Sequence, residues 1–590
     1  MKKPILLIAL GLMALLANAA PALRGAFTVT QADGTRLTVE QFGDEHHHWT
    51  ATADGSLVVN TERGYYVARI NESGQLEATD ILAHEPGQRD SSEEAAVRQQ
   101  AQRLALFHEQ GEQARRRALS IDESGYPYLP HHGQPRVLCI LAEFQDVSFS
   151  VNEPAVAFNQ MMNADHQEDL GNHNTQNIAS VSQYFQTCSE GQFSPVFDVV
   201  GPIRLPHDMA YYGGSDANGS DDQFNLFCSD AIAKVNEDNL VSDWSRYDND
   251  GNRQIELVCI IYAGYGQNQG GGNNTIWAKA SYLNAKVDND HRIAFFNCGC
   301  ELFHPNENFQ GWINGTGVFC HEFSHCLGLP DLYATTSAGY VNNQGMESWD
   351  LMDYGLYNNN GYAPALYTAW EQEVMGWTAI EPVSEAQELN SIYPLAEGGK
   401  AYKIVNSEND NDFIVLENIQ QRGLNTAARG HGLLVYHVAY PYSTVNMGDR
   451  TNNSPGRPSV AVVPASGVLI NSYLRGTGMP YTNNQWKEAV AASTFPGTQG
   501  ITTLSDEQQL PNYHFYVYPN GTKSVNFTLN GIEEDISSGA ISARLTTTSI
   551  QGLKADAPDY SSKAFTLDGR QQTSPYKGVI IQNGKKLMVK

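Results

Sequence analysis

The feature that most restricts how this chain can fold is the run from His321 to Asp331, which reads HEFSHCLGLPD. His321 and His325 are one helical turn apart, so on a helix both imidazoles lie on the same face. Two imidazoles arranged in this way can bind one Zn²⁺ at about 2.0–2.1 Å. A third ligand must come from another direction. The sequence therefore predicts a helix that ends soon after His325.

The residues after His325 can supply both the break and the third ligand. Gly328 can adopt the left-handed conformation that ends a helix, and Pro330 prevents the helix from resuming. Asp331 stands where the spacing H-E-x-x-H-x-x-G-x-x-H has its last histidine, and a carboxylate is a competent zinc ligand. We therefore expect His321, His325 and Asp331 to bind zinc and to leave one position open for water and substrate.

Glu322 follows the first ligand directly, but on a helix it points about 100° away from it. It is therefore a poor metal ligand and a suitable group to take a proton from a water molecule that the metal activates. A bare H-E-x-x-H pattern also occurs by chance in helices that bind no metal. Here Gly328 and Asp331 both stand at the expected steps, which favours the metal site.

A second group of residues, 348–355, resembles the methionine turn of metzincin peptidases. In those enzymes a methionine lies beneath the zinc ligands, and the resemblance implies this place for Met352, whose thioether is polarizable. It also implies that Tyr354 binds zinc or steadies the oxyanion, since a phenol can donate a hydrogen bond to developing negative charge. The alternative is that Met352 and Tyr354 are ordinary core residues.

Several segments together resemble the immune inhibitor A-like secreted bacterial metallopeptidases. The zinc motif is the specific part of this resemblance, and weaker matches lie at residues 43–55, 137–144, 180–193 and 432–437. The resemblance implies a propeptide, a metzincin-like zinc endopeptidase domain and β-rich domains after it. It also implies a zymogen that needs an activating cleavage.

The start of the chain predicts export. Lys2 and Lys3 precede an apolar run at residues 5–16, and Ala17-Asn18-Ala19 offers a cleavage site, which is the layout of a secretory signal peptide. We therefore expect a secreted or cell-surface protein, with no transmembrane segment in the mature chain. The eight cysteines all lie between Cys139 and Cys326. They could form disulfides in an oxidising compartment or remain buried thiols, and the pairing cannot be read from the sequence.

Charge and composition exclude two classes of protein. The chain has 37 basic and 65 acidic residues, a net charge of −28, which argues against nucleic acid as a partner. Hydrophobic residues make up 41% of the chain, enough for several cores and too many for a largely disordered protein.

Composition and periodicity predict a multidomain protein that combines an α/β part with an all-β part. Apolar runs at 137–144 and 255–262 predict strands, and residues 180–187 and 223–236 predict helices between them. Ser91 and Glu94 form a capping-box pattern that predicts a helix from 91 to about 117, which ends in three arginines that could be a processing site. The expected divisions are a signal peptide at 1–19, a propeptide at 20–117, the peptidase domain at 118–380, β-sandwich-like modules at 381–548 and a tail at 549–590.

A calcium site is expected in the loop that precedes residues 255–262. Oxygen-bearing side chains alternate there, and Ca²⁺ prefers six to eight such ligands. The loop departs from the EF-hand pattern, because Arg253 stands where a glycine is required, so a simple polar turn is the alternative. The proposed ligands are Asp248, Asp250, Asn252, Gln254 (through its backbone carbonyl) and Glu256.

The last residues form a basic tail, which is similar to the C-terminal sorting signals of type IX secretion. This resemblance implies contact with secretion machinery; the alternative is the last hairpin of the preceding domain. Taken together, the sequence predicts a secreted, zinc-dependent endopeptidase that hydrolyses protein substrates with Glu322 as general base. Two alternatives stay open: a zinc hydrolase of a non-peptide amide or ester, and an inactive, peptidase-derived surface binding protein.

Overall fold

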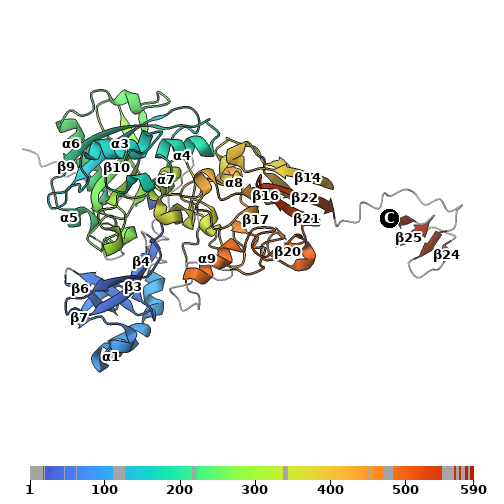
Figure 1. Ribbon diagram of the computed structural model, residues 1–590, viewed down its shortest axis with the longest axis horizontal. Coiled ribbons are helices and arrows are strands. Elements are labelled where there is room, and N and C mark those ends of the chain that lie inside the picture. The colour runs from blue at the N-terminus through green and yellow to red at the C-terminus, as the bar shows by residue number, and fades with distance from the viewer. Residues whose placement is uncertain are drawn as a thin grey trace, which may run out of the picture.

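The computed structural model describes residues 17–18, 20–44, 47–61, 63–110, 126–214, 221, 223–336, 343–449, 451–469 and 483–547, and short strands between 564 and 589. The predicted leader, apart from residues 17–18, and the three arginines at 115–117 lie outside this range. Figure 1 shows an N-terminal sheet domain beside an α/β domain, a β-rich region after it, and a small C-terminal sheet that lies apart. The structure therefore contains a mixed α/β domain and sheet-rich domains, as the sequence predicts.

The N-terminal domain is an antiparallel meander in the order β2-β3-β4-β5-β6-β7, with helix α1 packed on β6. Its elements are β2 (Phe27–Thr30), β3 (Arg36–Asp44), β4 (His47–Thr52), β5 (Leu57–Thr61), β6 (Gly64–Ile70), β7 (Leu76–Leu82) and α1 (Ser91–Ala101). The helix differs from the prediction at both ends. Its N-cap is Asp90 rather than Ser91, because the Asp90 carboxylate accepts from the backbone N–H groups of Ser92 and Glu93. It ends at Ala101, and helical residues resume at 104–110.

The α/β domain is built on a mixed sheet in the order β1-β11-β12-β10-β8-β9. Strands β12, β10, β8 and β9 are mutually parallel, whereas β11 and β1 run antiparallel to their neighbours. The strands are β1 (Ala17–Asn18), β8 (Arg136–Glu143), β9 (Val196–Arg204), β10 (Gln254–Tyr265), β11 (Lys279–Lys286) and β12 (Arg292–Leu302). The helices are α3 (Pro154–Asn163), α4 (Val181–Cys188), α5 (Met209–Gly213), α6 (Phe224–Glu237), α7 (Thr316–His325) and α8 (Ala369–Val374).

Alternating residues of the central strands supply two separate cores. Along β8, Cys139 and Leu141 belong to the core shared with α3, α4 and α7, whereas Leu138 and Ile140 belong to the core shared with α5 and α6. Both faces of the sheet are therefore covered by helices, which explains why its central strands are apolar throughout. The predicted strands at 137–144 and 255–262 and the predicted helices at 180–187 and 223–236 are confirmed by β8, β10, α4 and α6.

The β-rich region contains two larger sheets that share a core. One sheet has the order β13-β15-β16-β17-β18 and the other the order β14-β22-β21, and residues of both pack in one hydrophobic cluster. A short ribbon, β19-β20, and helix α9 complete the region. Its elements are β13 (Glu381–Pro382), β14 (Gln387–Ile392), β15 (Tyr402–Asn406), β16 (Asn409–Ile419), β17 (Gly432–Ala439), β18 (Val460–Val462), α9 (Asn483–Ala491), β19 (Phe515–Tyr516), β20 (Thr522–Lys523), β21 (Phe527–Asp535) and β22 (Ala540–Thr547).

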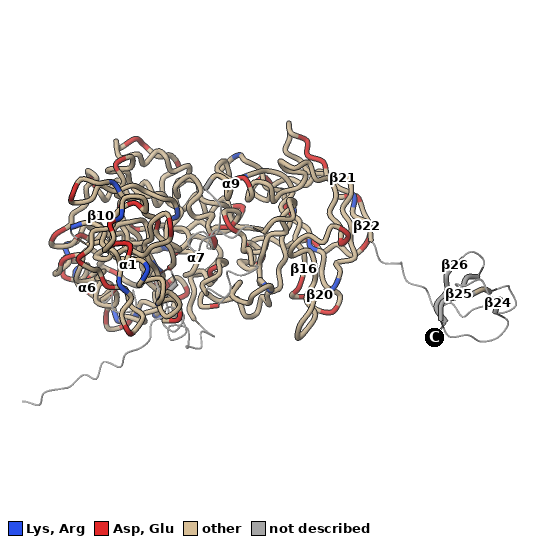
Figure 2. The backbone as a smooth tube through the Cα atoms, turned by 90° about the horizontal axis from the view of Figure 1, so that it is seen from below, with Lys and Arg blue, Asp and Glu red and all other residues tan. Residues whose placement is uncertain are grey.

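The tail forms a small sheet of its own in the order β24-β23-β25-β26 (Figure 1). Its strands are β23 (Ala564–Thr566), β24 (Gln571–Gln572), β25 (Gly578–Gln582) and β26 (Lys585–Val589). Acidic residues are spread over both the α/β and the β-rich parts (Figure 2). Within the described ranges, no helix has the length and hydropathy that crossing a bilayer requires. All eight cysteines are buried free thiols in this structure, and none of them forms a disulfide.

Candidate metal centre

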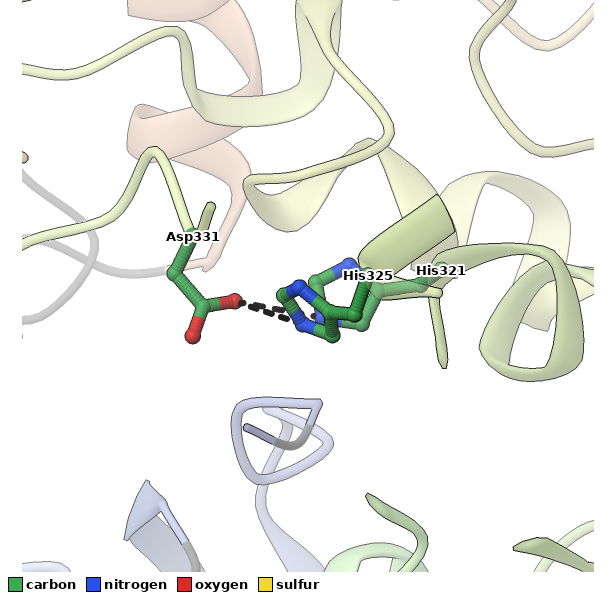
Figure 3. Close-up of side chains that lie close together, drawn as sticks. All are labelled: His321, His325 and Asp331. Atoms are coloured by element: carbon green, nitrogen blue, oxygen red, sulfur yellow. Dashed lines mark ion pairs between the residues drawn. The ribbon is translucent and has the colours of Figure 1, made fainter. Parts of the chain in front are cut away.

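The three predicted zinc ligands converge on one point. Nε2 of His321 and Nε2 of His325 lie 3.3 Å and 3.4 Å from Oδ1 of Asp331 (Figure 3). Both histidines project from α7, and Asp331 comes from the loop that follows it. Both imidazoles are fully buried, and the aspartate side chain is 9% exposed. The structure therefore brings together the three residues that the spacing predicts.

The donor atoms of these residues fit a metal ion. Among the described residues, Nε2 of His321, Nε2 of His325 and Oδ1 of Asp331 have no hydrogen-bond partner, although all three are buried. Buried polar atoms without partners are costly, and a cation bound between them would satisfy all three. Burial lowers the pKa of His321, which favours the neutral imidazole that binds metal. Burial alone would raise the pKa of Asp331, but His325 and His321 lower it to about 2.

Two backbone carbonyls fix the orientation of the histidines. Nδ1 of His321 lies 3.0 Å from the carbonyl oxygen of Leu351, and Nδ1 of His325 lies 2.8 Å from that of Leu329. A carbonyl oxygen can only accept, so Nδ1 carries the proton in each ring and the lone pair of Nε2 points at the metal position. Sequence reasoning did not find these two contacts, because both acceptors are backbone atoms.

The turn after α7 explains the contact to Leu329. Gly328 has φ of +99°, the left-handed conformation that the sequence predicted, and its N–H donates to the carbonyl of His325 at 2.9 Å. Leu329 N–H in turn donates to the carbonyl of Ser324 at 3.2 Å. This reversal ends the helix and directs the chain toward Asp331.

Met352 lies in a buried turn that is hydrogen-bonded to the ligand loop. Its carbonyl accepts from Leu332 N–H at 2.8 Å, and its own N–H donates to Oδ1 of Asp350 at 2.7 Å. Asp353 also supports the turn, since its carboxylate accepts from the backbone of Met346, Glu347 and Tyr354 at 2.8–2.9 Å. The preceding carbonyl, that of Leu351, is the acceptor for His321. The turn therefore links the first and third predicted ligands.

Glu322 is fully buried beside the predicted ligands. Its Oε1 accepts the backbone N–H of Ala20 at 2.6 Å, and its Oε2 has no hydrogen-bond partner among the described residues. Burial raises the pKa of this carboxyl well above its ordinary value. The side chain is therefore buried next to the predicted ligand His321 in the chain, with one oxygen bound to the N-terminal segment.

The N-terminal segment, residues 20–24, contacts several side chains around the metal centre. The phenol oxygen of Tyr354 accepts from Arg24 N–H at 2.8 Å, so this predicted catalytic residue binds the segment in the structure. The phenol of Tyr357 donates to Pro21 O at 2.7 Å, and the indole N–H of Trp277 donates to Ala20 O at 2.9 Å. Sequence reasoning missed Tyr357 and Trp277, and no short motif marks either of them.

The N-terminal sheet domain also contacts this part of the molecule. The Gln41 amide donates to the carbonyl of Gln267 at 2.9 Å. The His48 ring packs on Trp277 with 4.6 Å between ring centroids, and its Nε2 lies 3.0 Å from the amide nitrogen of Gln267. Strand pair β3-β4 therefore contacts Trp277, which also binds the N-terminal segment.

The predicted calcium ligands are partly brought together. Carboxylate oxygens of Asp248, Asp250 and Glu256 all lie within 4.8 Å of one another. Oε1 of Glu256 is buried without a hydrogen-bond partner among the described residues, and burial raises the pKa of this carboxyl. Asn252 lies in the same loop, where its side-chain oxygen accepts from Gln254 N–H at 2.7 Å.

Comparisons with known proteins find similarity to metallopeptidases. Residues 125–378 match the family model described as immune inhibitor A peptidase M6, catalytic domain. The pre-pro-metalloprotease PrtV of Vibrio cholerae serotype O1 is 26% identical over 329 residues, which cover 48% of this chain and 33% of that protein. Immune inhibitor A of Bacillus thuringiensis subsp. alesti is 24% identical over 271 residues, 40% of this chain and 39% of that protein.

The matches extend over only 33–39% of the relatives' own length. The family match at residues 125–378 includes the stretch that holds the two histidines, Glu322 and Asp331, which is the part with the specific motif. Residues 125–378 are therefore similar to the catalytic domain of the immune inhibitor A metallopeptidases, peptidase family M6.

Proposed function

We propose that this chain is a secreted, zinc-dependent endopeptidase that hydrolyses protein substrates. The observation that carries the proposal is the convergence of Nε2 of His321, Nε2 of His325 and Oδ1 of Asp331, all buried and without hydrogen-bond partners among the described residues. These residues would hold Zn²⁺, which when bound supplies a Lewis acid that polarises the substrate carbonyl and makes water more acidic.

Glu322 is the general base in this proposal. It takes a proton from the attacking water and later gives a proton to the nitrogen of the leaving amine. Its burial supports this role, because a carboxylate that water does not solvate is a stronger base. Met352 lies beneath the ligands. Tyr354 would donate a hydrogen bond to the developing oxyanion after the N-terminal segment has left its phenol.

Latency is part of the proposal. The predicted propeptide contacts Glu322 through Ala20, and it contacts Gln267 and Trp277 through β3 and β4. These contacts support a zymogen in which the propeptide excludes substrate. A cut near Arg115–Arg117, which lies outside the described residues, would separate the propeptide from the catalytic domain. No cysteine precedes Cys139, so latency cannot depend on a propeptide thiolate.

We further propose that Asp248, Asp250 and Glu256 bind Ca²⁺, with Asn252 and the carbonyl of Gln254 as additional oxygens. The β-rich region from 381 to 548 would be a sandwich-like accessory module, since its two larger sheets share a core. The tail would serve as a sorting signal that secretion machinery recognises. The predicted leader at 1–19 would direct the first export step.

The proposal is tested with the chain that begins at Ala20. The protein is treated briefly with trypsin, trypsin is inhibited, and cleavage of unfolded casein is measured with and without a zinc chelator. A Glu322→Ala chain processed in parallel is the matched control, because it keeps the predicted ligands and reports any residual trypsin.

We expect cleavage that chelation abolishes, zinc restores and the control lacks. Equal cleavage by the Glu322→Ala chain would refute the mechanism. Zinc bound without cleavage of casein would favour one of the two alternatives, a hydrolase of another amide or ester or an inactive binding protein.

A further inference from the structure

A half-buried arginine of the β-rich region lies near the turn that carries Met352. Arg429 stands in the loop before β17, and its Cζ lies 5.6 Å from the centre of the Trp486 ring in α9. The Trp486 ring in turn meets the Tyr354 ring edge-on, with 5.3 Å between ring centroids. The β-rich region therefore places a cation two contacts away from the residue proposed to bind the oxyanion.

The ring beneath this arginine is held in place. Trp486 is 2% exposed, and its indole N–H donates to Oε2 of Glu347 at 3.1 Å. The loop is also closely packed, since a Cβ on Gly430 would lie 3.3 Å from the Trp349 ring and 3.0 Å from the carbonyl oxygen of Ala491. The guanidinium therefore rests on a fixed surface, as the side chain of a binding site does.

Arg429 has no carboxylate partner among the described residues. It forms no ion pair with any of them, and its Nε is buried without a hydrogen-bond partner. By contrast, Arg422 in the same loop between β16 and β17 pairs with Glu397. A charged group that is removed from water is normally paired, because its desolvation is costly. Arg429 is therefore suited to bind a carboxylate from outside the protein.

A second cation stands beside Arg429. Lys487 follows Trp486 in α9 and also forms no ion pair among the described residues. Desolvation and then the charge of Arg429 lower the pKa of the Lys487 ammonium, so the two cations are within electrostatic reach of each other. Burial lowers the pKa of Arg429 as well, and an electrostatic interaction with Tyr354 acts in the opposite direction. A carboxylate bound by both cations would relieve their repulsion, and a guanidinium can hold it through two parallel hydrogen bonds.

The distance from Tyr354 limits which part of a substrate could reach Arg429. Contacts of 5.6 Å and 5.3 Å, on either side of Trp486, separate the guanidinium from the Tyr354 ring. An extended peptide spans about 3.3–3.6 Å per residue. A substrate whose scissile carbonyl lies at Tyr354 would therefore bring a side chain to Arg429 from at most about three residues away.

We propose that Arg429 and Lys487 form a subsite for an acidic side chain of the substrate, within about three positions of the bond that is cleaved. This inference rests on the proposed function and deepens it, since it gives the peptidase a preference for glutamate or aspartate. The α-carboxylate at the end of a peptide chain has the same chemistry, so both sources of the carboxylate are tested.

The first test uses the trypsin-activated chain and amidated peptides in which one glutamate is moved through an alanine-rich sequence, each with a glutamine counterpart. At one position near the cut, glutamate should raise kcat/KM at least about 10-fold over glutamine, the usual effect of a hydrogen bond to a charged group. Equal rates for every pair would overturn the inference. Cleavage that requires a free C-terminal carboxylate, with no gain from glutamate in the amidated peptides, would overturn it in favour of the chain end.

The second test assigns the preference to its residues. Arg429→Gln should remove most of the preference for glutamate, and Arg429→Glu should prefer lysine at the same position. Lys487→Gln changes an exposed side chain and should lower the preference by about 3-fold. Arg457→Gln is the matched control, because the Arg457 guanidinium also lies over a ring, that of Tyr516, at 4.1 Å.

The control should keep the full preference. The ratio of the two rates compares two substrates on one enzyme, so a variant that folds only in part still reports it. If Arg429→Gln does not fold at all, Lys487→Gln supplies the answer. A ratio that neither Arg429→Gln nor Lys487→Gln changes would contradict the assignment.

Direct binding separates this inference from the proposed function. The same peptides, labelled with a fluorophore, are titrated into the zinc-loaded, activated Glu322→Ala chain with and without Arg429→Gln. Tighter binding of a glutamate peptide that Arg429→Gln abolishes, together with no hydrolysis by the unsubstituted chain, would leave the subsite standing and reject the endopeptidase. Zinc-dependent hydrolysis without any preference for glutamate would reject the subsite and leave the endopeptidase standing.

Discussion

Nδ1 of His325 lies 2.8 Å from the carbonyl oxygen of Leu329, which is the residue that follows Gly328. The reversal at Gly328 is what turns this carbonyl back toward the helix. One glycine therefore has two effects: it ends α7, and it sets the tautomer and orientation of a predicted zinc ligand.

Gly328→Ala is expected to weaken zinc binding as well as folding. An alanine would be held at φ of +99°, at a cost of about 1–2 kcal/mol, and its Cβ would lie 3.3 Å from the ring of Tyr128. Displacement of the Leu329 carbonyl should lower zinc affinity about 10- to 100-fold. Gly398→Ala is the control, because Gly398 has φ of +74° and open space around it. It should lower the melting temperature and leave zinc affinity unchanged, as measured by competition with a chromogenic chelator.

Asp331→Asn tests the third ligand. The amide keeps the shape of the side chain and removes the charge that pairs with His321 and His325. Loss of a direct ligand should cost more affinity than the roughly 10- to 100-fold typical of an outer-shell change, and activity should fall with it. The measurement is the zinc content of protein dialysed against graded zinc buffers. Half occupancy of the variant at the zinc concentration that half-saturates the unsubstituted chain would exclude Asp331 as a ligand.

Asp353→Ala is expected to loosen the turn that carries Met352. Three backbone N–H groups would lose a buried acceptor, which should cost at least about 2 kcal/mol of stability. Because Leu351 in this turn orients His321, kcat should fall as well. Asp535→Ala is a matched control, since Asp535 also accepts from backbone N–H groups but is fully exposed. Chemical denaturation and casein cleavage of both variants would show whether burial makes the difference.

Much of the metal centre could be predicted because its residues lie close together in the sequence. The spacing of His321, Gly328 and Asp331 lies within one helix and its terminating turn, and helix geometry converts that spacing into a shared point in space. The central strands were predictable for a similar reason, since a sheet covered on both faces requires continuous apolar runs.

The contacts of the N-terminal segment could not be predicted in this way. Ala20 and Glu322 are 302 positions apart, and Pro21 and Tyr357 are 336 apart. Alanine, proline and a single tyrosine carry no pattern that indicates such a pairing. The cap of α1 was wrong for a smaller reason: Asp90 and Ser91 are both good N-cap residues, and only the backbone of the preceding turn decides between them.

Calcium is expected to stabilise the loop before β10. Added Ca²⁺ should raise the melting temperature of the unsubstituted chain, and Asp248→Ala should abolish that rise because it removes one of three clustered carboxylates. Asp288→Ala is the control, since Asp288 also accepts backbone N–H groups in a turn, those of Asp290 and His291. It should lower stability and keep the response to calcium. An equal rise in all three proteins would place the calcium elsewhere.

Glu417 should make stability depend on pH in a defined direction. It is buried where α8 meets β16, and its Oε2 accepts from Ala369 N–H at 2.9 Å and from the phenol of Tyr436 at 3.0 Å. Burial raises its pKa from 4.5 to about 7, so the fold favours the protonated form. The protonated Glu417 therefore stabilises the fold fully below about pH 4.5, and this stabilisation, about 3 kcal/mol at most, is lost as the pH rises through 7.

Glu417→Gln is neutral at every pH and should not show this loss. We expect the melting temperature of the unsubstituted chain to fall relative to that of Glu417→Gln between pH 5 and pH 8, and a difference that is constant with pH would show that Glu417 is ionised throughout.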